Sequence, residues 1–412
     1  MESEGPSVSA ASYALLAGGS LAYFLFLFVW FLLPAFLTPV IEGLGLSGTQ
    51  AGLVAGAVQA TYVPLGLASG LVIDRIGSRR AIAGGLVVLG AAHALRAGAS
   101  GFRGLLAGTV ALGAGGTAIT FGLPKLVSEL FPAERTGTMS SVYVVAASLG
   151  SGVAFALGRP YLGPLAGGWR PLFRWTGVAV VGFALAWLVA SRWLAGRADR
   201  FDRAAADPGT DRSVLGDLRA VVGHPQLRLV VLVGTMQLFV FHGLQAWVAT
   251  ALESRGLAAA AAATVASVLV LARIAGTLSV PPLSDRLGTR RWAVVGCGAL
   301  GAVGLVGLLA PPAFLLTALV VAVAGVGIGG LAPLMRSIPI ELDGIGPGLT
   351  GVATGLIFTV GEVGGFAGPF LVGGLRDVSG SFLPGFGLLA AGGAVVVLAG
   401  YLMEEPASVA AD

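Results

Sequence analysis

Charged side chains are scarce in this chain of 412 residues. They make up 11% of the sequence, against about 25% in an ordinary soluble domain. Hydrophobic residues make up 56%, and this composition excludes a soluble globular enzyme. The segment before the first apolar run, MESEGPSVSAAS, contains no lysine or arginine. It therefore lacks the basic region of a cleaved signal peptide, and we expect the first run to be a retained helix.

Cysteine and lysine are almost absent. The single thiol, Cys297, cannot form an intramolecular disulfide or a cysteine-based metal site. The formal charge of +4 comes almost entirely from arginine, because Lys125 is the single lysine. The sequence has no aromatic–basic motif for nucleic acid and no GxxxxGK[ST] loop for ATP. We therefore expect no cofactor, no metal, no nucleic-acid partner and no ATP-driven pump.

Long apolar runs and glycine are abundant. A membrane-spanning helix needs about 20 mostly apolar residues, so twelve spans use about 240. Glycine supplies 66 positions, many inside these runs, where small residues let helices approach closely. Glycine, proline and charge clusters delimit the predicted spans, which are 14–40, 48–73, 81–100, 104–130, 138–163, 172–195, 226–251, 259–283, 292–310, 313–340, 349–374 and 382–402. The predicted fold class is an all-α membrane protein with twelve transmembrane helices.

The longest polar stretch, Arg197 to Ala220, divides the chain near its middle. It predicts a six-helix bundle at 1–196, a cytoplasmic linker at 197–223 and a second six-helix bundle at 224–412. A repeat supports this division, because GLVIDRIGSRR ends at Arg80 and PPLSDRLGTRR ends at Arg291, about half a chain later. The two bundles are therefore predicted to be pseudo-symmetric copies.

Arginine is distributed unevenly between alternate loops. If both termini are cytoplasmic, the loops on that side hold about twice as many arginines as the loops on the other side. The linker contributes Arg197, Arg200, Arg203 and Arg212 to this excess. We predict a multi-pass protein of the cytoplasmic membrane with both termini inside.

The repeated string resembles the loop signature of the major facilitator superfamily, Gly-x-x-x-Asp-Arg-x-Gly-Arg/Lys-Arg/Lys. The first copy matches at Gly70, Asp74, Arg75, Gly77, Arg79 and Arg80, with Ser78 at a basic position of the pattern. The second copy matches at Asp285, Arg286, Gly288, Arg290 and Arg291, with Pro281 in place of the leading glycine. The resemblance covers nearly the whole chain and implies the major facilitator fold.

In that superfamily the loop acts as a conformational latch, and the resemblance implies a gating role for Asp74, Arg75, Arg79, Asp285, Arg286 and Arg290. An aspartate at a helix end, a tight glycine turn and two cations can bridge to a neighbouring helix terminus. The alternative is that these arginines only fix topology. Two further gating pairs are predicted near helix ends, Lys125 with Glu129 and Arg336 with Glu341.

A second resemblance lies at the end of the fourth span. GLPKLVSELFPAERTG, Gly122 to Gly137, is similar to carriers grouped with cyanate permeases and nitrate/nitrite carriers, and the second half echoes it from Gly330 to Gly351.

Two ionisable residues are predicted at mid-membrane depth. Counting 1.5 Å per residue from the nearest helix ends places Arg273 and Glu362 at a common depth, about 16–18 Å from the cytoplasmic edge. Charges at that depth are costly, so they are candidates for function. Arg273 can hold a carboxylate or oxyanion, and Glu362 can take up a proton. The alternative is a purely structural ion pair between the two.

Polar and aromatic residues on neighbouring helices complete the predicted site. Gln237 and Gln245 share one helix face with Phe241, and His242 beside them is a candidate for proton coupling or for a hydrogen-bonded interior role. Tyr62, the repeat counterpart of Arg273, shares a face with Gln59, whereas Ser148 is the counterpart of Glu362. Trp30 is a further candidate contact, with core packing as its alternative.

These features predict a secondary active transporter, not an enzyme, that moves a small organic or inorganic anion by alternating access, driven by proton symport or exchange. Its expected partners are the lipid bilayer, the solute and protons, and we expect it to function as a monomer. The alternative function is a multidrug-type efflux carrier for amphipathic compounds. A sensor built on the same fold would need a soluble output domain larger than this linker.

Overall fold

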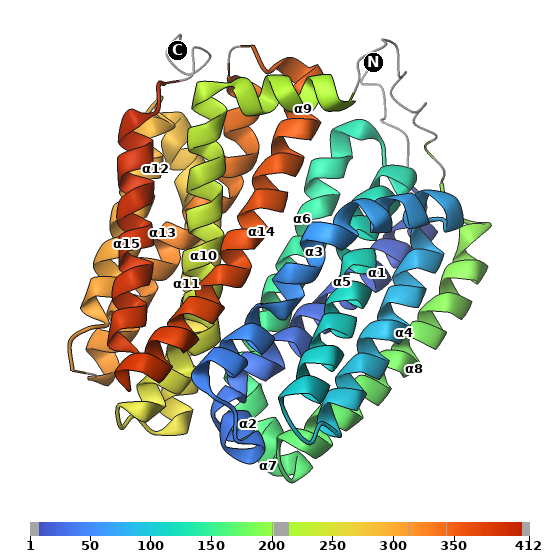
Figure 1. Cartoon of the computed structure of the whole chain (residues 1–412). Coiled ribbons are helices and arrows are strands. Elements are labelled where there is room, and N and C mark those ends of the chain that lie inside the picture. Colours follow the sequence, from blue (N-terminus) through green and yellow to red (C-terminus); the bar gives the residue numbers. More distant parts are fainter. Residues whose placement is uncertain (1–7, 200, 202–213, 312, 343, 406–412) are drawn as a thin grey trace. The chain divides into compact units, whose positions relative to one another are not determined.

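The chain folds into helices. The computed structural model describes residues 8–199, 201, 214–311, 313–342 and 344–405, and none of these residues lies in a β-strand. The first part of the chain forms α1 (Ala10–Ala35), α2 (Leu37–Leu44), α3 (Gly48–Ile76), α4 (Ser78–Ala97), α5 (Phe102–Leu130), α6 (Ala133–Val153), the π-helix η1 (Ala154–Leu162), α7 (Gly163–Ala166) and α8 (Trp169–Ala195). The second part forms α9 (Val214–Gly223), α10 (Pro225–Ser254), α11 (Ala259–Arg286), α12 (Arg291–Gly307), α13 (Phe314–Glu341), α14 (Gly346–Ser379) and α15 (Leu383–Leu402) (Figure 1).

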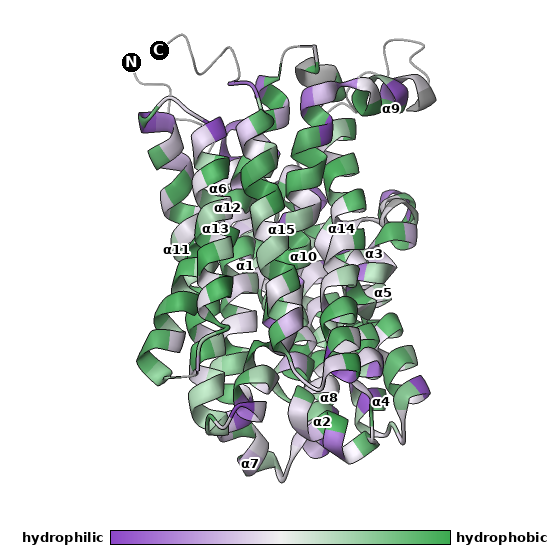
Figure 2. Cartoon of the chain, turned by 60° about the vertical axis from the view of Figure 1, so that its left-hand side comes forward, coloured by the Kyte–Doolittle hydropathy of each residue, from purple (hydrophilic) through white to green (hydrophobic). Residues whose placement is uncertain are grey.

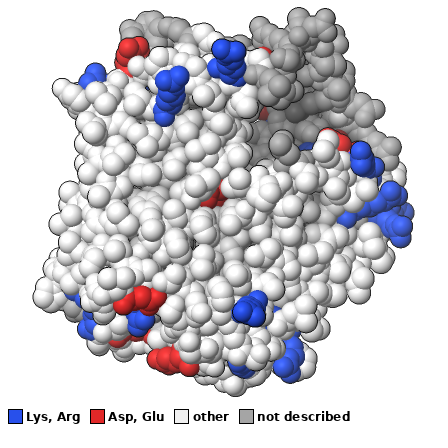
Figure 3. All heavy atoms as spheres, viewed as in Figure 1, with Lys and Arg blue, Asp and Glu red and all other residues white. Residues whose placement is uncertain are grey.

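The helices have the length and composition of membrane spans. Among the described residues, ten spans qualify, and α3 makes an eleventh if its bent parts, Gly48–Gly66 and Ala68–Ile76, count as one. The apolar helix α12, with 17 residues, fills the remaining predicted position. Hydrophobic residues run along these helices and hydrophilic ones lie mainly at their ends (Figure 2), where charged side chains also gather (Figure 3). The predicted all-α, twelve-helix fold class is confirmed.

Two local features differ from the sequence prediction. The predicted span 14–40 is interrupted at Phe36, three residues before Pro39. Proline removes a backbone hydrogen bond and crowds the preceding turn, so Pro39 explains the interruption. The predicted linker contains a helix, α9, that packs on α10 and α14. Residues 200 and 202–213 of the linker, with Arg200, Arg203 and Arg212, lie outside the described residues.

Packing groups the described residues into two compact units. The first unit draws on residues 1–32, 64–154 and 161–210, and the second on 33–63, 155–160 and 211–412. In the first unit, α4 packs against α5 and α8. In the second unit, α10 packs against α14 and α15, α11 against α13, and α12 against α13 and α15. The division at 196 and 224 inferred from the linker stays a prediction.

Candidate functional site

Close packing of α10 and α14 forms the frame of the candidate site in the second unit. A Cβ atom at Gly364 or Gly368 would overlap the carbonyl oxygen of Thr235 or Phe239 on α10. The indole Nε1 of Trp247 on α10 donates to the carbonyl oxygen of Pro369, 2.9 Å away. The glycines therefore bring the two backbones together, and this contact fixes the position of the side chains between them.

A buried hydrogen bond joins α3 to α10 at the centre of this frame. The Gln59 amide lies 2.7 Å from Nδ1 of His242, and the two residues are 2% and 6% exposed. When the amide NH₂ donates to the carbonyl oxygens of Gly56 and Ala55, the amide oxygen accepts from His242 Nδ1. His242 is then a donor at Nδ1, and its neutral form keeps Nε2 as an acceptor.

Glu362 on α14 lies beside this bond. A Cβ atom at Gly365 would lie 3.0 Å from Glu362 Oε2, 3.1 Å from His242 Cδ2 and 3.2 Å from Gln59 Cγ, so three polar side chains converge on one glycine. Glu362 Oε2 is buried and has no hydrogen-bond partner in the part of the chain that the structure describes. A buried carboxylate oxygen without a partner is costly unless a ligand or proton satisfies it.

Arg273 on α11 contacts the same α10 segment. Its guanidinium carbon lies 3.7 Å from the centroid of the Phe241 ring, and that ring lies 4.4 Å from the His242 ring. Arg273 Nε is buried without an acceptor among the described residues. Arg273 and Glu362 do not form an ion pair with each other in the described part of the chain.

The other predicted contact residues divide between the two units. Gln237 Nε2 donates to the Ile328 carbonyl at 3.4 Å, and Gln245 is 1% exposed with both amide atoms unpartnered among the described residues. Tyr62 is partly buried in the second unit, one helical turn after Gln59. Trp30 belongs to the first unit, where it stacks on Phe26 and Phe31 with centroid distances of 5.4 and 5.0 Å.

The repeat counterpart Ser148 also lies in the first unit. It is exposed, and its hydroxyl donates to the carbonyl oxygen of Val144, 3.1 Å away on its own helix.

The loop strings form the tight turns that the sequence predicts, but their ion pairs differ. Gly77 and Gly288 have φ of +85° and +59°, values that favour glycine. Arg75 and Arg286 are exposed, and Arg79 is partly buried.

The predicted pair Lys125–Glu129 does not form. Lys125 pairs with Asp74, and Glu129 accepts a hydrogen bond from the Ser78 hydroxyl at 2.7 Å. Lys125 and Glu129, four residues apart on α5, therefore do not pair with each other. The end of α3 and the start of α4 lie close enough to supply their partners instead. These two contacts join the ends of α3 and α4 to α5.

The predicted pair Arg336–Glu341 is also wrong. The Arg290 guanidinium forms ion pairs with two carboxylates, that of Glu341 at 2.8 Å and that of Asp285 at 2.5 Å. The guanidinium carbon of Arg336 lies 4.9 Å from the centroid of the Phe358 ring. The Asp74–Lys125, Ser78–Glu129 and Arg290–Glu341 contacts each join residues 51 positions apart. The two loop copies thus contact the equivalent helix end with different side chains.

The sequence interpretation missed a third set of contacts, all in the second unit. Asp377, on the last turn of α14, accepts hydrogen bonds from the backbone N–H groups of Gly48 and Thr49 at 2.6 and 2.7 Å, at the start of α3. Arg159 on η1 pairs with Glu253 on α10. The string Ser47–Gly48–Thr49–Gln50 has the capping-box pattern, a helix-start signal that could have drawn attention to this end of α3.

Comparisons with known proteins place the chain in a family context. A family model described as "Major Facilitator Superfamily" matches residues 19–369. A "Putative tartrate transporter" of Agrobacterium vitis is 26% identical over 84% of this chain and 82% of its own length. The "Nitrate/nitrite transporter NrtP" of Picosynechococcus sp. is 30% identical, over 30% of this chain and 23% of its own length.

A solved structure has the same fold. The inward-facing, unoccupied structure of a bacterial homologue of the human lysosomal transporter Spinster superposes with a TM-score of 0.77 and 17% identity. The match covers 95% of this chain and 96% of that one. At this identity the likeness concerns the fold alone.

Proposed function

This chain belongs to the Major Facilitator Superfamily, a family of membrane transporters of small solutes, and from that premise we propose that it carries a small anion by alternating access. The proposed solute is a small carboxylate or inorganic oxyanion. The Agrobacterium vitis relative, whose name gives tartrate as its solute, supports the carboxylate. The more specific proposal is that the solute is cyanate, nitrate or nitrite, and the partial match to the nitrate/nitrite transporter supports it.

The unneutralised guanidinium of Arg273 carries this proposal. A ring face holds it instead of a carboxylate, and its buried Nε has no acceptor among the described residues. A bound carboxylate would supply that acceptor in a charge-assisted pair. Gln245 offers an amide group for further hydrogen bonds, and Gln59, Gln237 and Tyr62 extend the polar surface of the same unit.

Glu362 is the proposed coupling group. Its Oε2 is buried without a partner and converges with His242 and Gln59 on Gly365. Protonation of a buried carboxylate removes an uncompensated charge, so proton binding there favours occlusion of the site. His242, which the Gln59 amide holds in place, is the second residue proposed for coupling.

The proposed orientation places both termini in the cytoplasm and the chain in the cytoplasmic membrane, as a functional monomer. The loops around Asp74 and Asp285 then latch the cytoplasmic ends of the helices. The Asp377–Thr49 and Arg159–Glu253 contacts lie at the opposite helix ends and close the outer side. In alternating access, the contacts on one side of the membrane break while those on the other side remain formed.

Uptake into proteoliposomes tests the proposal. A panel containing tartrate, smaller carboxylates and nitrate is offered with and without an inward proton gradient. We expect gradient-dependent accumulation of at least one anion, abolished in Arg273→Gln and retained in Arg174→Gln, which removes an exposed arginine of α8. Glu362→Gln should retain anion exchange but lose accumulation driven by the gradient. Expulsion of a lipophilic dye without accumulation of any anion would overturn the proposal in favour of an efflux carrier.

A further inference from the structure

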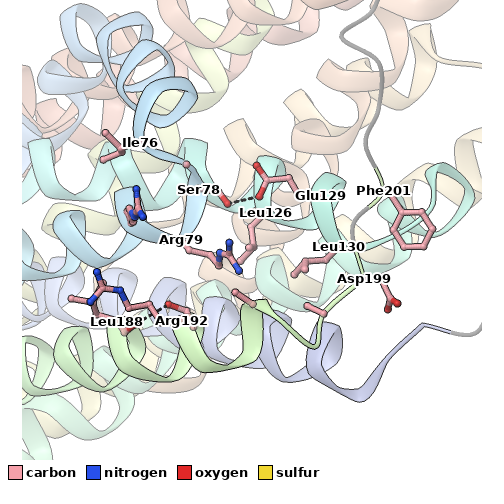
Figure 4. Close-up of a pocket in the computed structure, with 15 residues that line it drawn as sticks. Ile76, Ser78, Arg79, Leu126, Glu129, Leu130, Leu188, Arg192, Asp199 and Phe201 are labelled. Carbon is pink, nitrogen blue, oxygen red and sulfur yellow. Dashed lines mark hydrogen bonds between the residues drawn. The ribbon is translucent and has the colours of Figure 1, made fainter.

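A cavity of about 520 Å³ lies in the first unit, apart from the candidate site. The start of α4, the last turns of α5 and α8, and the residues after α8 form its walls (Figure 4). Its volume is within the range of about 300–1,000 Å³ typical of small-molecule sites. Six charged or hydroxyl side chains that line it matter here: Ser78, Arg79, Arg80, Glu129, Arg192 and Asp199.

The two carboxylates of the cavity already have partners. Glu129 accepts the Ser78 hydroxyl at 2.7 Å, a bond visible in Figure 4. Asp199 accepts the backbone N–H of Ser9 at 2.6 Å and the Ser12 hydroxyl at 3.2 Å. These bonds lower the pKa of Asp199, which therefore stays ionised and engaged with the start of α1.

The three arginines have no such partners. In the described part of the chain, no carboxylate or carbonyl accepts from the guanidinium of Arg79, Arg80 or Arg192. Three cations against two occupied carboxylates leave the cavity with a net positive charge. The planar guanidinium group of arginine donates paired hydrogen bonds to the oxygens of a phosphate group. Two arginines on different walls of the cavity can therefore bind the same phosphate group.

A hydrogen bond joins two of the walls that carry these arginines. The Trp187 indole on α8 donates to the backbone carbonyl of Arg79 at 3.1 Å, so the two walls are tied together. Leu126, Leu130 and Leu188 form an apolar floor. Arg79 is partly buried on α4, and Arg192 comes from the facing helix α8 (Figure 4).

We propose that this cavity binds a phosphate group, supplied by the headgroup of an anionic lipid or by a soluble phosphate compound. The adjacent face of α8 bears the exposed apolar residues Leu185, Val189 and Trp193. Acyl chains of a lipid can pack on such a face, and tryptophan is typical of the membrane–water interface. A soluble phosphate would use the arginines alone.

Binding measurements on the purified full-length chain test this site. In one arm, phosphatidylglycerol is titrated into detergent-solubilised protein and bound lipids are counted by native mass spectrometry, with phosphatidylcholine as the neutral comparison. In the other arm, inorganic phosphate is added without lipid and the melting temperature is compared with that in chloride of equal ionic strength. The variant is R79Q/R192Q, and the matched control is R197Q, whose guanidinium stacks on Trp193 at 3.9 Å outside the cavity.

We expect the double variant to lose about tenfold or more of the affinity for phosphatidylglycerol or phosphate, because two charge-assisted contacts are removed, while R197Q retains it. Loss in the lipid arm alone assigns the headgroup, and loss in the phosphate arm assigns a soluble compound. Equal binding by wild type and double variant, or equal loss in R197Q, overturns the proposal. If the double variant does not fold, the single variants R79Q and R192Q are compared with R197Q by the same criteria.

Discussion

Asp377 Oδ2 accepts two hydrogen bonds from Thr49, one from the backbone N–H and one from the hydroxyl, each 2.7 Å long. The carboxylate of α14 therefore caps the first turn of α3, and Gly48 donates to its other oxygen. A carboxylate at a helix start satisfies N–H groups that have no partner within the helix and interacts favourably with the helix dipole.

Asp377→Ala should loosen the start of α3. Loss of a capping side chain costs about 1 kcal/mol, so amides 48–50 are expected to exchange hydrogen about fivefold faster. Hydrogen exchange followed by mass spectrometry measures this rate. Glu42→Gln, an exposed acidic residue on α2, is the control and should leave the rate unchanged. Unchanged exchange in Asp377→Ala would show that the cap does not hold this end of α3.

Arg290→Gln should weaken the second loop copy. The Arg290 side chain is 11% exposed and bridges Glu341 and Asp285; the hydrogen bond with Glu341 and then that with Asp285 raise its pKa. Losing the bridge leaves a partly buried carboxylate unpaired, at a cost of about 2 kcal/mol. Thermal unfolding in detergent measures the loss. Arg286→Gln, an exposed arginine of the same loop, should unfold like the wild type; an identical fall for both would mean that the bridge contributes nothing specific.

Gly365→Ala should impair transport more than stability. The new methyl group would lie 3.0–3.2 Å from Glu362, His242 and Gln59, a tight contact that these side chains must relieve by moving. Overpacking of this kind costs about 1–3 kcal/mol. We expect anion uptake to fall about tenfold or more while the protein still reaches the membrane. Gly355→Ala, on the same helix with open space around it, is the control; wild-type uptake by Gly365→Ala would remove these three residues from the site.

Asp199 should contribute to stability in a pH-dependent way. Its hydrogen bonds with Ser9 and Ser12 lower its pKa in the folded chain from the usual 3.8. A group with a lowered pKa stabilises the fold above its unfolded pKa, and this contribution disappears as pH falls through the folded pKa. The difference in melting temperature between wild type and Asp199→Asn should therefore be constant at pH 5–8 and shrink below about pH 3.8. A difference that grows as pH falls would contradict this assignment.

The sequence predicts the fold well because its signals are local. Apolar length delimits the helices, and Gly77 and Gly288 mark turns through the conformational freedom of glycine itself. Depth counting along single helices grouped Arg273 with Glu362, and the structure places both beside the Phe241–His242 segment of α10.

Contacts between helices were harder to predict. Lys125 and Glu129 satisfy the spacing of an ion pair within one helix, yet each finds a partner on another helix end. Asp377 looks like an ordinary loop residue, because its role depends on the start of α3, more than 300 positions earlier. Sequence spacing records neighbours along a helix, whereas these partners arise only when helices pack.

The cation–π contact between Arg273 and the Phe241 ring has an energetic consequence for the transport cycle. A ring face attracts a cation without cancelling its charge. The Arg273 charge therefore remains uncompensated in a low-dielectric environment when the site is empty. Closing the candidate site around this uncompensated charge is costly, and a bound anion lowers the cost. Under the proposed function, the loaded carrier therefore closes more readily than the empty one, and slippage without solute is suppressed.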